Sequence, residues 1–172
     1  MPTSHNHTIS FAYVAIGSNL GDRRLYIDAA LKEMNALPET KLVAKSSVIQ
    51  TEPIGADLSS DKPFLNAIAK LSTRLEPTCL MQELLAIEKR HGRSRDGISK
   101  DRTLDLDLII YDQLIFRSEN LILPHPRISE RLFVLEPLAE IAPDFIIPGI
   151  RLTVKELLKK ARFSMGLTIE SE

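Results

Sequence analysis

The sequence predicts an α+β fold in which an antiparallel sheet carries two helices on one face. Three observations predict it: strand-like apolar runs, two longer stretches with apolar residues at helical spacing, and glycines or prolines at the boundaries between them. The predicted elements follow the order β-α-β-β-α-β, which is the ferredoxin-like arrangement. Such a core leaves the second face of its sheet free for a binding site, and a C-terminal α/β extension follows it.

The first half of the core supplies a strand, a helix and a second strand. Residues 11–16 form an apolar run typical of a buried strand, and the turn-rich residues 17–21 follow it. Asp22 is a plausible N-cap of the helix, which Pro38 ends. One face of this helix carries an apolar stripe made of Ile27, Ala30, Leu31, Met34 and Leu37. A second strand is predicted over residues 42–51.

The second half of the core supplies a strand, a helix and a final strand. Residues 64–75 alternate in the manner of a third strand. Pro77 suits the first turn of a helix that runs to about residue 91, where Gly92 ends it. A polar loop then leads to the last strand, at residues 103–111. The extension that follows contains two predicted helices, at residues 132–141 and 154–161.

The composition indicates a soluble, intracellular protein. The chain has 172 residues, 44% of them hydrophobic, and its single cysteine rules out a disulfide framework. A formal charge of -1 argues against general nucleic-acid binding, and no apolar run approaches the length of a membrane span. We therefore expect a cytoplasmic monomer with a disordered polar tail at residues 1–10 and a single domain at residues 11–172.

The strand at residues 103–111 carries the strongest functional signal. Alternate side chains of a strand point to opposite faces, so Asp105 and Asp107 stand side by side with their Cα atoms about 7 Å apart. The apolar residues expected on the opposite face are Leu104, Leu106, Leu108 and Ile110. Two such carboxylates can bind hard cations, and the basic residues just before them suit an anion. The pattern predicts a Mg-polyphosphate site, although acidic residues on the wet face of a half-buried sheet would give the same pattern.

Several nearby features have both a structural and a functional interpretation. The basic loop at residues 93–101 is either a solvated loop or one that closes over a polyphosphate. Glu88 lies beside the apolar stripe of the second helix and points either to the surface or into the site. The glycines of residues 17–21 match no phosphate-loop spacing, so we favour a tight turn. His125, held in an extended stretch between two prolines, can donate to a phosphate oxygen when neutral, and Arg131 can bind phosphate bidentately.

Taken together, these segments resemble the 6-hydroxymethyl-7,8-dihydropterin pyrophosphokinase family, from Ala12 to about Pro148. The resemblance rests on motifs in the right order and spacing, namely Ala15-Ile16-Gly17-Ser18-Asn19-Leu20-Gly21, Thr51-Glu52-Pro53, Phe64-Leu65-Asn66, Arg102-Thr103-Leu104-Asp105-Leu106-Asp107 and Leu123-Pro124-His125-Pro126-Arg127. The family is known for a ferredoxin-like core. The resemblance implies transfer of the β,γ-pyrophosphoryl unit of ATP to the hydroxymethyl oxygen of the pterin, which releases AMP, in folate biosynthesis.

The resemblance also implies roles for the matching residues. Asp105 and Asp107 would hold two Mg²⁺ ions, and Arg93 and Arg102 would act in catalysis by neutralising charge on the phosphates. The implied ATP-binding residues are Glu88, Arg93, Arg95, Arg102, His125 and Arg131. The implied pterin-binding residues are Thr51, Pro53, Ile54, Phe64, Asn66 and Phe133, with the ring stacked between the two phenylalanines.

The chain departs from the family mainly in the arginine loop. The family usually has a tryptophan just before the arginine of the acidic strand, and this chain has no tryptophan. Residues 92–102 also look about one residue shorter than in the best-known bacterial form, and Phe64 stands where some members carry tyrosine. These departures leave the metal and phosphate residues in place, so we expect activity with altered affinity.

Two other functions are compatible with a core of this kind. Ferredoxin-like sheets also bind RNA through exposed aromatic residues, but aromatic residues make up only 5% of this chain. A regulatory domain that binds a small molecule without chemistry would not need the paired aspartates.

Overall fold

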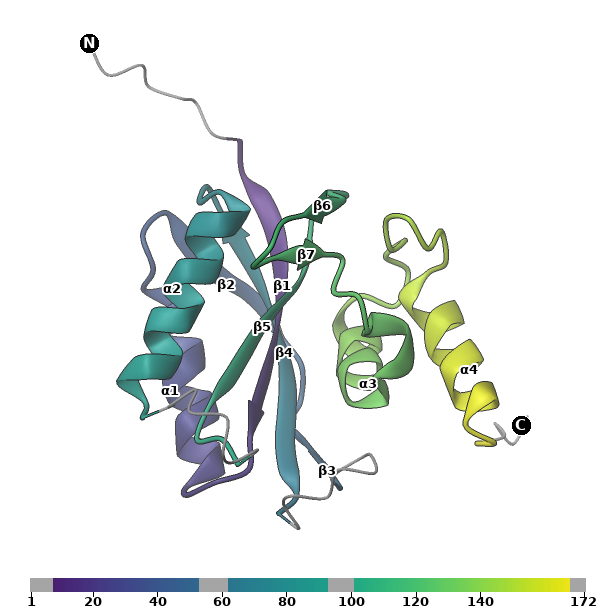
Figure 1. Ribbon diagram of the computed structural model, residues 1–172, viewed down its shortest axis with the longest axis horizontal. Coiled ribbons are helices and arrows are strands. Elements are labelled where there is room, and N and C mark those ends of the chain that lie inside the picture. The colour runs from purple at the N-terminus through teal and green to yellow at the C-terminus, as the bar shows by residue number, and fades with distance from the viewer. Residues whose placement is uncertain (1–7, 53–61, 93–100, 168–172) are drawn as a thin grey trace.

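The computed structural model describes residues 8–52, 62–92 and 101–167, in which a five-stranded sheet has helices packed on both faces (Figure 1). The sheet consists of β1 (Ser10–Ser18), β2 (Thr40–Lys45), β3 (Ile49–Thr51), β4 (Phe64–Thr73) and β5 (Asp105–Tyr111). The helices are α1 (Arg23–Asn35), α2 (Pro77–Arg90), α3 (Leu132–Ile141) and α4 (Val154–Ser164). A hairpin of β6 (Phe116–Arg117) and β7 (Ile122–Leu123), followed by the 3-10 turn η1 (Ile128–Glu130), lies between β5 and α3. Within these ranges, no helix is long and apolar enough to cross a membrane.

The sheet has the strand order β2-β4-β1-β5, and every neighbouring pair is antiparallel. The single strand predicted at residues 42–51 is wrong, because β2 and β3 are separate strands that both pair with β4. Between them, the Ile68 N–H donates to the Ser46 side-chain hydroxyl at 2.8 Å instead of to a backbone carbonyl. This side-chain bond interrupts the regular ladder, since a serine hydroxyl competes with backbone groups as an acceptor.

One core lies between the sheet and the pair α1 and α2. The predicted stripe of α1 is buried here, together with Leu80, Leu84 and Ile87 of α2 and the leucines of β5. Asp22 caps α1 as predicted, since its carboxylate accepts the Leu25 N–H at 3.1 Å. These two helices therefore hold the strand that carries the acidic pair.

A second core lies on the opposite face, between the sheet and the pair α3 and α4 (Figure 1). The expectation that this whole face is free is therefore wrong, and the open part is limited to one end of the sheet. The prediction of α3 at residues 132–141 is confirmed, while α4 continues past residue 161 to Ser164. A capping box in which Thr153 and Glu156 bond each other's backbone N–H fixes the start of α4.

Two expectations about the strands are also corrected. Ile110 does not join the leucine face of β5, because the register shifts between Tyr13 and Val14 of β1 and leaves Ile109 as the extra residue of a bulge. Beyond that bulge Ile110 packs into the second core. At the other end of β1, Ser10 is already a buried strand residue, so the strand begins one residue before the predicted residue 11.

Candidate active site

Three strands bring candidate site residues together around Gly17, near the end of β1. Gly17 pairs with Asn66 of β4 on one side and with Asp105 of β5 on the other. A Cβ atom added to Gly17 would lie 3.2 Å from Asn66 Oδ1, 3.7 Å from Phe64 Cδ1 and 3.9 Å from Asp105 Cβ. A glycine inside a strand often marks such a close approach. The missing side chain therefore leaves a space that Phe64, Asn66 and Asp105 border.

The acidic pair lies on the predicted face of β5. Asp105 and Asp107 are both partly exposed, whereas Leu106 between them is fully buried. Arg131, just before α3, places Nη1 3.9 Å from Asp107 Oδ2. The carboxylates thus combine access to solvent with a cationic neighbour, as an anion-bearing metal complex would require.

The two carboxylates are compatible with a magnesium ion that takes its other ligands from phosphates and water. Across residues 8–52, 62–92 and 101–167, no group of three or more His, Cys, Asp and Glu side chains could hold a metal ion. Mg²⁺ usually keeps several waters and binds through one or two carboxylates plus substrate phosphates. Two adjacent carboxylates therefore suit a magnesium ion that also binds a phosphate ligand.

Glu88 is buried beneath the acidic strand. Only 2% of the residue is exposed, which excludes the surface alternative. Its Oε1 atom accepts the Leu106 N–H at 2.8 Å, so it bonds the backbone between Asp105 and Asp107. Hydrogen bonds between a buried carboxylate and backbone N–H groups are strong and directional. Glu88 thus fixes the strand on which both aspartates stand.

Arg102 is held at its backbone by Asn19, which follows β1. The Arg102 N–H donates to Asn19 Oδ1 at 2.6 Å, and the Asn19 N–H donates to the Arg102 carbonyl at 3.0 Å. Asn19 is 3% exposed, and its Nδ2 also donates to Asp101 Oδ1 at 3.0 Å. The predicted turn at residues 17–21 is shorter than expected, because Gly17 and Ser18 belong to β1. Asn19, the first residue after β1, bonds the start of the acidic segment through its side chain.

His125 is held as a neutral ring close to the acidic pair. Its backbone N–H donates to the Ile109 carbonyl at 2.9 Å, and its Nδ1 accepts the Arg127 N–H at 3.1 Å. Burial, followed by the positive charges of Arg131 and Arg127, lowers the pKa of His125 to about 4, against an opposing effect of Asp105. Since Nδ1 is an acceptor, the proton of the neutral ring is on Nε2, which is free to act as a donor.

A cavity of about 200 Å³ adjoins Asp107 and His125. Its other lining residues are Met81, Leu108, Glu119, Asn120, Leu121, Ile122 and Pro126. The mixture of apolar walls with a few polar groups is typical of a site for a small molecule, and such sites usually have volumes of about 300–1,000 Å³. The cavity therefore suits part of a nucleotide rather than all of it.

The candidate pterin residues lie on the other side of Gly17. Asn66 is buried, and its Nδ2 donates to Thr51 Oγ1 at 2.6 Å. This bond leaves Asn66 Oδ1 as an acceptor beside Gly17. Phe64 begins β4, and Phe133 lies in the first turn of α3 with its ring 5.6 Å from Arg131 Cζ.

The structure brings most of the predicted site residues to one end of the sheet, although Pro53, Ile54, Arg93 and Arg95 lie outside the described residues. Sequence reasoning missed two residues that organise this region, Gly17 and Asn19. The signal that could have found both is the motif from Ala15 to Gly21, in which they directly follow the predicted strand.

Comparisons with known proteins identify the relatives of this chain. The family model described as 7,8-dihydro-6-hydroxymethylpterin-pyrophosphokinase (HPPK) matches residues 13–143. A Pseudomonas aeruginosa protein named 2-amino-4-hydroxy-6-hydroxymethyldihydropteridine pyrophosphokinase is 42% identical over 156 residues, covering 90% of this chain and 94% of its own. A Haemophilus influenzae protein of the same name is 40% identical over 149 residues, covering 87% of this chain and 91% of its own.

Solved structures show the same fold at low sequence identity. A crystal structure of Plasmodium falciparum HPPK-DHPS aligns with a TM-score of 0.75 at 13% identity, over 98% of this chain and 49% of that one. This chain therefore spans about half the length of that protein. With the family model matching most of the chain and relatives near 40% identity, the chain belongs to the 7,8-dihydro-6-hydroxymethylpterin-pyrophosphokinase family.

Proposed function

We propose that this chain transfers the pyrophosphoryl group of ATP to 6-hydroxymethyl-7,8-dihydropterin, giving AMP and the pterin diphosphate, in folate biosynthesis. The relatives near 40% identity are named for this pyrophosphokinase activity. The observation that carries the proposal is the row Asn66–Gly17–Asp105, which sets a candidate pterin residue beside the metal-binding strand. A pterin on one side of Gly17 would then have its hydroxymethyl group next to a metal-bound phosphate.

Two Mg²⁺ ions would be held by Asp105 and Asp107 together with the phosphates of ATP. When bound, the metal neutralises charge on the transferring group and orients it. The protein then has little covalent work to do and acts mainly through positioning and electrostatics. Arg131, next to Asp107, supports this role because a guanidinium can bind a phosphate through two hydrogen bonds.

Part of the nucleotide would occupy the cavity beside Asp107 and His125, with the phosphates directed towards the acidic pair. His125 would donate from Nε2 to a phosphate oxygen, since its lowered pKa keeps it neutral at pH 7. The arginines Arg93, Arg95 and Arg102 join this set on the basis of the family motif. Glu88 belongs to the same region, and its bond to the Leu106 N–H supports a role in holding the metal strand.

The pterin would lie over Gly17, between Phe64 and Phe133. Asn66 Oδ1 would accept an N–H of the ring, because the Asn66 amide is already oriented by Thr51. The flat heterocycle would stack on the two phenyl rings. Pro53 and Ile54 complete the pterin set from the motif alone.

The fold and assembly state complete the proposal. The antiparallel strand order β2-β4-β1-β5 supports a ferredoxin-like core in which β2 and β3 together take the place of one strand. Helices α3 and α4 form the extension, and the protein acts as a cytoplasmic monomer.

The proposal is tested by identifying the nucleotide product. The protein is incubated with Mg-ATP and 6-hydroxymethyl-7,8-dihydropterin, and the nucleotides are separated by anion-exchange chromatography. We expect AMP in amounts equal to the pterin consumed, and no AMP without the pterin or in excess EDTA. Formation of ADP, or turnover that is unaffected by EDTA, would contradict the proposal.

A further inference from the structure

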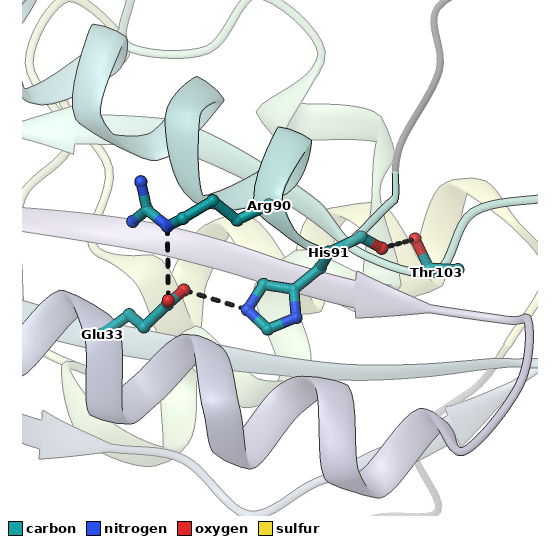
Figure 2. A network of polar contacts seen from close by, with 4 residues as sticks. All are labelled: Glu33, Arg90, His91 and Thr103. Atoms are coloured by element: carbon teal, nitrogen blue, oxygen red, sulfur yellow. Dashed lines mark hydrogen bonds and ion pairs between the residues drawn. The ribbon is translucent and has the colours of Figure 1, made fainter.

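The end of α2 is joined to α1 by a polar network that lies outside the proposed substrate sites (Figure 2). Glu33 of α1 places Oε2 2.9 Å from His91 Nε2 and Oε1 3.4 Å from Arg90 Nε. The ring of His91 also meets the ring of Tyr26 edge-on, with centroids 5.8 Å apart. Tyr26 and Glu33 are two turns apart on α1, so they lie on one face of the helix. The His91 side chain is therefore held against that face.

The backbone of the same residue holds the chain just before the acidic strand. Thr103 Oγ1 donates to the His91 carbonyl at 2.6 Å, as Figure 2 shows. Thr103 is two residues before Asp105, so this bond links the end of α2 directly to the start of β5. The network thus runs from α1 through His91 to the strand that carries both aspartates.

Besides the bond from Thr103, side chains of other elements also hold this end of the strand. Asn19 bonds the backbone of Arg102, and Glu88 bonds the backbone of Leu106. The acceptor of the Thr103 bond belongs to His91, whose side chain in turn contacts Glu33 on α1. Side-chain exposures of 33% for Glu33 and 20% for His91 mean that this pair contributes little to global stability. The main effect of the Glu33–His91 contact is therefore to fix the position of Thr103.

We propose that Glu33, His91 and Thr103 are positioning residues, which set the location of the Asp105 and Asp107 carboxylates for the metal-bound nucleotide. The proposal rests on the pyrophosphokinase function proposed above. A misplacement of about 1 Å in a catalytic group can lower a rate by about 100-fold. Because Asn19 and Glu88 still hold the strand when the network is broken, the expected loss is smaller, about tenfold.

The matched pair Thr103→Val and Thr103→Ser tests the proposal. Valine keeps the shape of threonine and removes the donor, whereas serine keeps the hydroxyl. For Thr103→Val we expect kcat to fall about tenfold and the Mg²⁺ concentration for half-maximal activity to rise, while the KM for the pterin changes less than about twofold. Thr103→Ser should restore both values to near the wild type.

The variant Glu33→Ala tests the same network from its other end. Glu33→Ala should lower kcat and raise the required Mg²⁺ concentration by less than Thr103→Val does. The double variant should have the same kcat as Thr103→Val alone, because both substitutions act through His91. Arg162→Ala serves as the control, since it removes a comparable helix-to-helix ion pair, the 3.3 Å contact with Glu136, away from this network. Thermal unfolding of each variant shows whether it is folded at the assay temperature.

Metal binding without turnover separates this proposal from the proposed function. Electron paramagnetic resonance of free Mn²⁺, titrated with protein and a non-hydrolysable ATP analogue, should show weaker Mn²⁺ binding for Thr103→Val than for Thr103→Ser. Absence of AMP from the wild type would defeat the proposed function but would leave this difference intact. Equal Mn²⁺ affinity in the two Thr103 variants, or additive effects in the double variant, would overturn the positioning role.

Discussion

At the scale of single residues, the proposed site centres on the carboxylates of Asp105 and Asp107, which have different neighbours. Asp105 borders the space above Gly17, and Asp107 borders the cavity and Arg131. The pair therefore lies between the proposed pterin and nucleotide sites. Charge at these two positions, rather than hydrogen bonding alone, is what a metal-bound polyphosphate requires.

Removing either charge should nearly abolish turnover. Asp105→Asn and Asp107→Asn keep the size of each side chain, and we expect kcat to fall by about 100-fold or more, the scale on which electrostatic stabilisation of transition states acts. Initial rates of AMP formation at saturating Mg²⁺ measure the effect. Asp112→Asn at the opposite end of β5 is the matched control, because asparagine keeps the acceptor for the Phe11 N–H and tolerates the φ of 46° there. Wild-type rates in both site variants would show that these carboxylates do not bind the essential metal.

His125 makes a separate prediction about stability and pH. Its pKa is lowered to about 4 in the folded protein, mainly by burial, from the usual 6.5. The unfolded chain therefore binds more protons between these values, and the free energy of unfolding should decrease as the pH falls from about 6.5 towards 4. Urea unfolding in EDTA should show this dependence in the wild type and a weaker one in His125→Gln. The same slope in both proteins would mean that His125 is not buried as a neutral ring.

At the scale of elements, the site is made by three strands rather than by any one of them. The row Asn66–Gly17–Asp105 crosses β4, β1 and β5, and it places side chains from distant parts of the sequence around one glycine. The pterin half of the site should therefore be sensitive to the size of the residue on β1.

Gly17→Ala tests this arrangement. The new Cβ would lie 3.2 Å from Asn66 Oδ1, so the amide must move by a few tenths of an ångström from its orientation towards the pterin. We expect the KM for the pterin to rise about tenfold, in line with the cost of about 1–3 kcal/mol for a mismatched group in a binding pocket, while the KM for ATP changes little. Steady-state kinetics with each substrate varied in turn measure both values. An unchanged KM for the pterin would place the ring elsewhere.

The elements that sequence reasoning predicted are those defined by local patterns. Asp22 and Pro38 bound the first helix region, and the alternation around Asp105 follows from the period of a strand. The break between β2 and β3 was missed because it depends on the bond from Ile68 to Ser46, which lie 22 residues apart. The bulge at Ile109 was missed for the same reason, since it arises from the register with β1.

At the scale of the whole molecule, helices on both faces of the sheet confine the site to one end. The sequence predicted the acidic pair and most of its candidate partners, but it wrongly predicted a free sheet face, because the packing of α3 and α4 is a property of the tertiary structure. Gly17 was missed for a related reason. Its importance comes from the absence of a side chain between Asn66 and Asp105, and neither neighbour is near it in the sequence.

In the proposed reaction, both terminal phosphates of ATP move together to the pterin. The most direct measurement uses ATP labelled at the β-phosphorus, with the pterin product separated from nucleotides before counting. We predict that the label moves into the pterin product in the same amount as AMP is formed. Label that stays in ADP, while a label at the γ-phosphorus enters the pterin, would contradict the claim and indicate a single phosphoryl transfer.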